Sequence, residues 1–173
     1  MIEIKNLGSL SLEAYKGLEA LEKVVFEHEG TLYDHQPWEL SNFIYELPNK
    51  QNLSFVAFSN EKIIGFSIAY LFKPFWGHIS RFAVSPNHVG KKVGLKLFEK
   101  QLDEMRNQRV NKITVDLIKK NEKALRFYER NKFETLKGKE LESYILERER
   151  EKSEYLSNQP SHIAMQKSLN GIN

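Results

Sequence analysis

The chain has 173 residues, of which 40% are hydrophobic, and this suits one globular domain that buries a proper core. The net charge of +3 arises from 26 basic and 23 acidic residues interspersed over most of the chain, which argues against a nucleic-acid partner. The sequence has no cysteine, no signal or transit peptide and no apolar run near the ~18 residues of a membrane span, so we expect a soluble cytoplasmic protein without disulfides, metal or membrane contact.

The first half of the chain is predicted to form two helices and four strands. A short alternating strand covers residues 2–5. A helix ends near Gly30, because apolar residues recur before it at helical spacing, namely Leu12, Tyr15, Leu18, Leu21, Val25 and Phe26. A second, short helix has Pro37 in its first turn and ends before Pro48. Three β-rich runs follow, the first two joined by a hairpin signal at 59–62: residues 53–58, 63–72 and 78–84.

The second half begins with a predicted helix from Val89 onward. Its buried face is marked by Val93, Leu97, Phe98, Leu102 and Met105. Residues 113–118 form the next strand. Strand, turn, helix and strand make a βαβ unit, which implies a right-handed crossover, parallel pairing and a ligand crevice at the carboxyl end of the first strand.

The C-terminal part is predicted as a helix from Asn121 to near Asn131, an extended segment at 133–136 and a closing strand at 163–169. Between the last two lies a charged segment, residues 139–157. We expect it to be a helix packed only at Leu141, Tyr144, Ile145, Tyr155 and Leu156. A strand over residues 144–146 is the alternative. No linker divides the chain, so residues 1–173 are predicted to form a single domain.

Residues 82–94 contain the pattern that is most informative about function. An apolar strand is stopped by Pro86, and two glycines then bracket two lysines where a helix begins: Phe82-Ala83-Val84-Ser85-Pro86-Asn87-His88-Val89-Gly90-Lys91-Lys92-Val93-Gly94. The first-turn amides of a helix carry roughly half a positive charge, so they form an anion site. Gly90 and Gly94 let the backbone approach a ligand, and Lys91 and Lys92 add charge. The expected ligand is a phosphate.

A second signal lies on the helix that begins at Asn121. Asn121, Ala124 and Tyr128 stand at i, i+3 and i+7, so they share one helix face. An amide, a small residue and a phenol in a row offer an elongated ligand a hydrogen bond, clearance and a proton donor. Taken alone, this pattern is better explained by Asn121 as an N-cap and by Tyr128 as a core aromatic residue with its hydroxyl at the surface.

Together, these two segments resemble the GNAT family of N-acetyltransferases. The family pattern is hydrophobic-x-Val-x-Pro, then Arg/Gln-x-x-Gly-x-Gly/Ala opening a helix, and later Asn-x-x-Ala-x-x-Phe-Tyr-x-x-x-Gly-Phe. Residues 82–86 fit the strand, 89–94 fall on the loop and 121–133 fit the later helix. The resemblance covers most of the chain except the charged segment 139–157. It implies an α/β (α+β) fold with a twisted, mostly antiparallel mixed sheet, a central parallel βαβ unit and helices on both faces.

The resemblance also implies a reaction. The chain is expected to be an acetyl-CoA-dependent N-acetyltransferase, acting by direct attack on a primary amine of a small molecule or polypeptide, as a monomer or homodimer. Acetyl-CoA would lie along the strand and the loop, with its pyrophosphate on the loop amides. The implied cofactor-binding residues are Phe82, Ala83, Val84, Val89, Gly90, Lys91, Lys92, Val93, Gly94, Leu95, Asn121 and Ala124. Tyr128 is the implied catalytic residue, which donates a proton to the departing thiolate.

Three residues depart from the family pattern. Val89 takes the Arg/Gln position, Lys92 that of the first fingerprint glycine, and Lys132 that of the glycine before Phe133. Amide donation survives any side chain that leaves the backbone in place. A lysine in a glycine's place is tolerated only where φ is negative. The phosphate site is therefore expected, and a weaker or slightly reshaped form of it is the alternative.

The sequence does not identify the general base. Relatives often carry a glutamate just before the hydrophobic-x-Val pattern, where this chain has Ser80 and Arg81. The candidate bases are His78, Glu27, His28, Glu29 and His35. Another set of aromatic residues forms either a substrate-contacting wall or simply core: Tyr70, Phe72, Phe75 and Trp76.

Two other functions compete with catalysis. The departures from the family pattern also suit a non-catalytic acyl-CoA-binding or regulatory module, because binding needs only the loop and the groove. The charged segment 139–157 also suits a protein-interaction domain.

Overall fold

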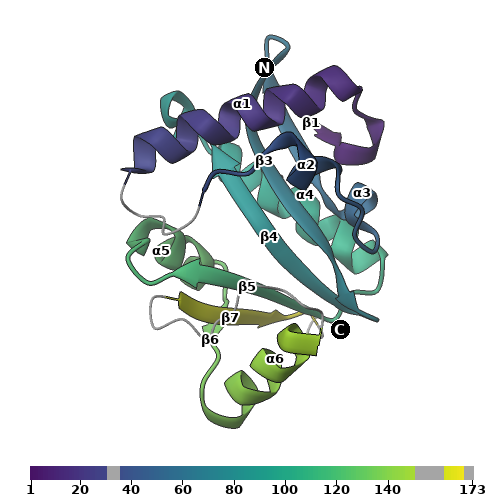
Figure 1. The fold of residues 1–173 in the computed structure, drawn as a ribbon, viewed down its shortest axis with the longest axis vertical. Helices are drawn as coiled ribbons and strands as arrows, with labels where there is room; N and C mark the ends of the chain where they lie inside the picture. The colour runs from purple at the N-terminus through teal and green to yellow at the C-terminus, as the bar shows by residue number, and fades with distance from the viewer. Residues whose placement is uncertain (31–35, 151–161, 170–173) are drawn as a thin grey trace. The chain divides into compact units, whose positions relative to one another are not determined.

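The structure is a computed structural model that describes residues 1–30, 36–150 and 162–169 (Figure 1). The chain divides into two compact units, residues 1–111 and 112–173. Across the described ranges, every helix is too short or too polar to cross a membrane.

The first unit is built on an antiparallel meander of four strands. They are β1 (Ile2–Asn6), β2 (Phe55–Ser59), β3 (Lys62–Lys73) and β4 (Trp76–Val84), each paired with the next. The predicted hairpin between β2 and β3 is confirmed, with Asn60 and Glu61 both at positive φ. Two adjacent left-handed residues match the right-handed twist of the flanking strands.

Helices α1 (Leu12–Glu29) and α4 (Val93–Asn107) cover opposite faces of this meander (Figure 1). Alternating residues of the strands point to opposite faces, so each strand contributes to two separate cores. Leu18 of α1 belongs to one cluster with Phe66, and Leu97 of α4 belongs to the other with Ile64. The ends of α1 agree with the sequence prediction, since Ser11 caps the start and Gly30 ends the helix at positive φ.

Short helices connect β1, α1 and β2: η1 (Leu7–Ser9), α2 (Leu40–Ile44) and α3 (Lys50–Leu53). The prediction that Pro37 lies in a helical first turn is wrong, because α2 begins at Leu40 behind the cap residue Glu39. The buried ammonium of Lys50 donates hydrogen bonds to the carbonyls of Asn42, Phe43 and Tyr45 at 3.1, 2.7 and 2.6 Å. The Lys50 ammonium therefore caps the carbonyls at the end of α2, and Lys50 is itself the first residue of α3. The sequence pattern did not predict this arrangement.

The second unit holds β5 (Lys112–Ile118), α5 (Glu122–Arg130), β6 (Glu134–Thr135), α6 (Gly138–Arg150) and β7 (His162–Ser168). Strand β7 pairs antiparallel with both β5 and β6. Helix α6 is held by a hydrogen bond of 2.9 Å from the Tyr144 hydroxyl to Asp116 Oδ1 on β5.

The charged segment is helical as predicted over its described part, and the alternative of a strand at residues 144–146 is wrong. Tyr155 and Leu156 lie outside the described residues. The elements β4, α4 and β5 follow one another as the predicted βαβ unit requires.

Candidate functional site

The predicted phosphate loop leads from the end of β4 into α4. Phe82, Ala83 and Val84 end the strand, and residues 86–88 form the short helix η3 (Pro86–His88). Gly90 follows at a φ of 81°, with open space where a Cβ would be. Helix α4 starts at Val93, so the prediction of helix from Val89 onward is wrong by four residues: turns occupy this stretch.

The amide groups of the loop divide into two sets. The Val89 amide donates to Pro86 O at 3.3 Å, and the Lys91 amide donates to His88 O at 3.2 Å, so both are used by the turn itself. Val93, Gly94 and Leu95 form the first turn of α4, where amides have no intrahelical acceptor. The cap residue Lys92 offers no side-chain acceptor. Within the described residues these three amides have no protein acceptor, which is the arrangement a phosphate needs.

The backbone of Lys92 is left-handed, with φ 61° and ψ 14°. Lys132, the second lysine in a glycine's place, is also left-handed, with φ 65°. The condition of negative φ is therefore not met at either position. The backbone keeps a conformation that favours glycine while the sequence supplies lysine, at a cost of roughly 1–2 kcal/mol per residue.

The start of α4 packs closely on Gly65 of β3. A Cβ built on Gly65 would lie 3.1 Å from Ala83 O, 3.1 Å from Leu97 Cδ1 and 3.2 Å from Val93 Cγ1. Gly65 therefore sets how near the first turn of α4 comes to the sheet. Gly65 was not among the residues predicted for the site, although a glycine inside an apolar strand is a signal of close approach.

The end of β4 directs its backbone groups to both edges of the strand. Ser85 N donates to Ile64 O on β3 at 2.9 Å, and Ala83 pairs with Phe66 in the same register. Because backbone groups alternate in an antiparallel ladder, those of Phe82 and Val84 point to the edge opposite β3.

The second predicted segment lies on α5, in the second unit. The Asn121 side chain accepts a hydrogen bond from Ala124 N at 3.0 Å and so acts as the N-cap. Tyr128 is 3% exposed and packs edge-on against Phe127 and Phe133, with ring centroids 5.3 and 5.0 Å away. Burial raises the pKa of the Tyr128 phenol well above its ordinary value. The phenol therefore stays protonated at any ordinary working pH.

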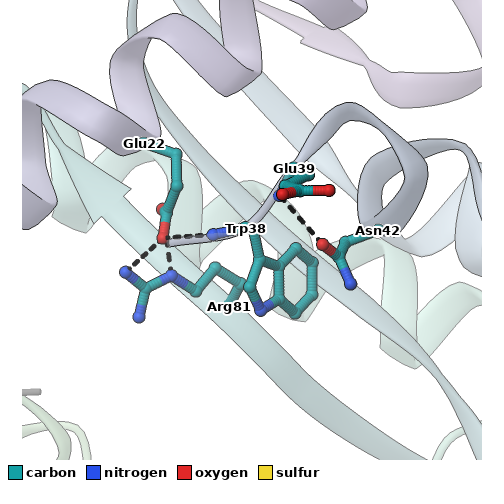
Figure 2. Close-up of polar contacts among 5 residues, drawn as sticks. All are labelled: Glu22, Trp38, Glu39, Asn42 and Arg81. Carbon is teal, nitrogen blue, oxygen red and sulfur yellow. Dashed lines mark hydrogen bonds and ion pairs between the residues drawn. The ribbon is translucent and has the colours of Figure 1, made fainter. Parts of the chain in front are cut away.

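Ser80 and Arg81, which occupy the place of the family's glutamate, are both engaged. The Ser80 hydroxyl donates to Ile68 O at 3.3 Å. Arg81 binds both oxygens of Glu22 on α1, with Nε–Oε2 3.0 Å and an NH2–Oε1 distance of 2.7 Å (Figure 2). Oε1 of Glu22 also accepts from Trp38 N at 3.3 Å. Glu22 was not among the residues predicted for the site, although its sequence position gives it helical spacing from the buried residues Leu18 and Val25.

The candidate bases occupy different environments. His78 lies buried in β4, where its ring is 5.5 Å from that of Tyr70. Glu27 and His28 are exposed and Glu29 is half-buried at the end of α1, and His35 lies outside the described residues.

The four aromatic residues of the possible substrate wall, which lie on β3, on β4 and in the turn between them, differ in exposure. Tyr70 and Phe72 are buried, as in a core, and Trp76 packs edge-on against Phe72 at 5.3 Å. Phe75 is 54% exposed. Only Phe75 therefore presents most of its surface to solvent.

Comparison with known proteins identifies relatives of this architecture. The family model described as "Acetyltransferase (GNAT) family" matches residues 17–133. No curated protein matches the sequence. The ribosomal-protein-S18-alanine N-acetyltransferase from Escherichia coli has a similar structure, with 17% identity and a TM-score of 0.72 over 100% of this chain and 97% of that one.

Two further structures show the same likeness. PaiA N-acetyltransferase from Thermoplasma acidophilum, in complex with coenzyme A, is 16% identical with a TM-score of 0.69, over 97% of this chain and 99% of that one. A GNAT-family acetyltransferase from Staphylococcus aureus Mu50 is 17% identical with a TM-score of 0.74, over 98% of this chain and 99% of that one. The predicted fold class is therefore confirmed.

Proposed function

This chain belongs to the acetyltransferase (GNAT) family, and from that premise we propose that it is an acetyl-CoA-dependent N-acetyltransferase. The acceptor would be a primary amine of a small molecule or of a polypeptide. We further propose that residues 1–173 act as one acetyltransferase domain, as a monomer or homodimer.

The observation that carries this proposal is the start of α4. The amides of Val93, Gly94 and Leu95 have no protein acceptor among the described residues, and the preceding turn holds Gly90 in a left-handed conformation with open space around it. A helix N-terminus of this kind stabilises a phosphate through hydrogen bonds and the helix dipole. The site fits the pyrophosphate of a CoA thioester, with Lys91 and Lys92 supplying charge.

The remaining cofactor contacts follow the family pattern. The backbone groups of Phe82 and Val84 would bind the pantetheine arm as a strand does, with Ala83 holding β4 to β3 on the other edge. Asn121 and Ala124 would contact the same arm. The exposed side chains of Val89 and Leu95 flank the loop, so they would border the nucleotide end.

Tyr128 is proposed as the proton donor. Acetyl-CoA supplies an acyl group activated as a thioester, and the attacking amine must be neutral, whereas an alkyl ammonium with a pKa near 10.4 is protonated at neutral pH. The amine nitrogen forms a bond to the acetyl carbon while the carbon–sulfur bond breaks. Tyr128 passes its phenolic proton to the departing thiolate, the amine nitrogen releases one proton to the solvent or to a base, and the phenolate takes up a proton again, so that the net reaction moves one proton from the amine to the thiol. A phenol kept protonated by burial can donate a hydrogen bond to the developing thiolate.

Two of the similar solved structures support this proposal through their substrate and their bound ligand. The acetyltransferase from E. coli is described as acting on an alanine of a ribosomal protein, and the structure from T. acidophilum contains coenzyme A. These descriptions support a CoA thioester and an amine acceptor for this chain. Both a polypeptide and a small amine therefore belong among the substrates to be tested.

One observation favours a second candidate, a non-catalytic acyl-CoA-binding module. Ser80 and Arg81, which stand where relatives often carry a glutamate, are bonded to Ile68 and Glu22. Neither provides a base. Catalysis would then depend on His78, on the acidic and histidine side chains near the end of α1, or on desolvation of the amine.

Two assays separate the candidates. Thermal shift with acetyl-CoA tests the binding site, and thiol release from acetyl-CoA in the presence of an amine panel tests transfer. A catalyst gives both responses, and the thiol release depends on the amine. A binding module gives only the thermal shift. Absence of both responses would contradict each candidate.

A further inference from the structure

The strongest polar feature outside the proposed binding groups is the buried pair formed by Glu22 and Arg81 (Figure 2). The side chain of Glu22 is 0% exposed and that of Arg81 is 10% exposed. Through the additional bond from Trp38 N, one carboxylate joins α1, the segment before α2, and β4. Both oxygens of Glu22 are occupied, so Glu22 is not a free base.

The pair lies directly beside an irregularity in β4. Arg81 is opposite Ile68 on β3, whereas Ile79 is opposite the next residue, Ala69. Ser80 is therefore an extra residue on β4, a β-bulge, and its hydroxyl is bonded to Ile68 O. Phe82 and Val84, which follow Arg81 on β4, are the residues whose backbone is proposed to hold the acyl-CoA arm.

A bulge that moves along a strand reverses the face of each residue that it passes, and also the edge to which that residue's backbone groups point. In the observed register Arg81 points to the α1 face and reaches Glu22, and Phe82 packs on the α4 side with Val93 and Leu97. To reach Phe82 or Val84 the bulge would first have to pass Arg81, and the Arg81 guanidinium would then face α4. Glu22 would then be a buried charge without its partner, which is strongly unfavourable.

The ion pair of Glu22 and Arg81 therefore selects one position of the bulge, and with it one register of β4 against β3. We assign the pair this role rather than a large contribution to the free energy of folding. Replacing a buried ion pair with apolar side chains of similar volume is often neutral or stabilising. The selected register is the one in which Phe82 and Val84 direct their backbone groups to the edge opposite β3.

We propose that Glu22 and Arg81 are positioning residues that fix the β4 bulge, so that the backbone of Phe82 and Val84 is presented to the acyl-pantetheine arm. This proposal rests on the proposed function, since it assumes that a CoA thioester binds along β4. It assigns no contact with the ligand to either side chain. It predicts that loss of the pair weakens binding of the arm and spares binding of the phosphates.

The test compares two ligands, acetyl-CoA and adenosine 3′-phosphate 5′-diphosphate, which carries the pyrophosphate but lacks the arm. The main variant is the double substitution Glu22→Met with Arg81→Met, whose folding is checked by thermal melting. We expect it to lose about tenfold or more in affinity for acetyl-CoA while its affinity for the arm-less ligand changes by less than about twofold. The control is Glu19→Gln, which removes the exposed ion pair to Lys23 on the same helix; both of its affinities stay unchanged.

Equal losses for both ligands, or no loss for either, in a folded double variant would overturn the proposal. If the double variant does not fold, Arg81→Lys is measured instead, because lysine keeps the positive charge but cannot form the bidentate contact with the Glu22 carboxylate. This variant should also lose affinity for acetyl-CoA and not for the arm-less ligand, by a smaller factor than the double variant. A wild-type protein that binds neither ligand would instead refute the proposed function, and this proposal with it.

Discussion

Replacing Lys92 with glycine is expected to make the protein more stable. Lys92 has a φ of 61° at the start of α4, and such a left-handed backbone costs a non-glycine residue roughly 1–2 kcal/mol. Glycine removes this cost but gains freedom in the unfolded chain, which offsets about 0.4–1 kcal/mol. The free energy of unfolding should therefore rise by about 0.5–1 kcal/mol, or about 1–4 °C in melting temperature for a chain of this length.

The matched control is Lys92→Ala, measured beside Lys92→Gly by thermal and urea unfolding. Both substitutions remove a lysine charge from a helix N-terminus, where a cation is unfavourable, so that effect cancels between them. Alanine keeps the Cβ that makes positive φ costly. The glycine variant should therefore be the more stable of the two. A glycine variant that melts at or below the alanine variant would refute the reasoning.

Lys132→Gly repeats the comparison away from the phosphate loop. Lys132 has a φ of 65°, so its replacement by glycine should give a similar gain over Lys132→Ala. The Lys92 variants also separate two roles of this residue in acetyl-CoA binding. If the charge of Lys92 contributes to binding, Lys92→Gly and Lys92→Ala should lose the same affinity for acetyl-CoA. If the backbone strain at Lys92 contributes, the two variants should differ in this affinity.

Three further predictions concern other parts of the chain. Tyr128→Phe should lower the turnover number for thiol release about a hundredfold or more with little change in acetyl-CoA affinity; an unchanged turnover number would exclude Tyr128 as the proton donor. Gly65→Ala should destabilise the protein by about 1–3 kcal/mol, because its Cβ would lie 3.1 Å from Ala83 O, whereas Gly94→Ala, whose Cβ would lie 3.4 Å from the Phe82 ring, should not; equal stability in urea would contradict this. Lys50→Met should lower the free energy of unfolding, since three carbonyls lose a donor. Burial lowers the pKa of the Lys50 ammonium from 10.5 to about 8, so in that interval the unfolded chain binds more protons and the wild type should gain stability relative to the variant as the pH rises; a flat or falling difference would show that the folded state keeps the proton at least as well as the unfolded chain.

Much of the fold was predictable because local signals agreed with the tertiary structure. The ends of α1, the hairpin at Asn60 and Glu61 and the cap at Asn121 all follow from residue types with a local physical preference. The segment before β2 was harder. Its structure depends on the ammonium of Lys50, whose acceptors lie five to eight residues away.

The candidate site was predictable in position but not in detail. The glycines and lysines located the loop, yet the amides of Val89 and Lys91 are used by the turn and only the tertiary structure reveals this. The left-handed backbone at Lys92 is unusual for its residue type, and the sequence alone left the sign of φ at this position open. The pair of Glu22 and Arg81 joins residues 59 positions apart, and no local pattern links them.

The most direct test of the account is whether an acetyl group reaches an amine. Wild-type protein is incubated with acetyl-CoA and a panel of small primary amines and peptides with free N-termini, and both thiol release and acetylated product are followed. We predict amine-dependent thiol release and a product acetylated on nitrogen for at least one member of the panel. Binding of acetyl-CoA with no acetylated amine anywhere in the panel would contradict catalysis and leave the chain a binding module.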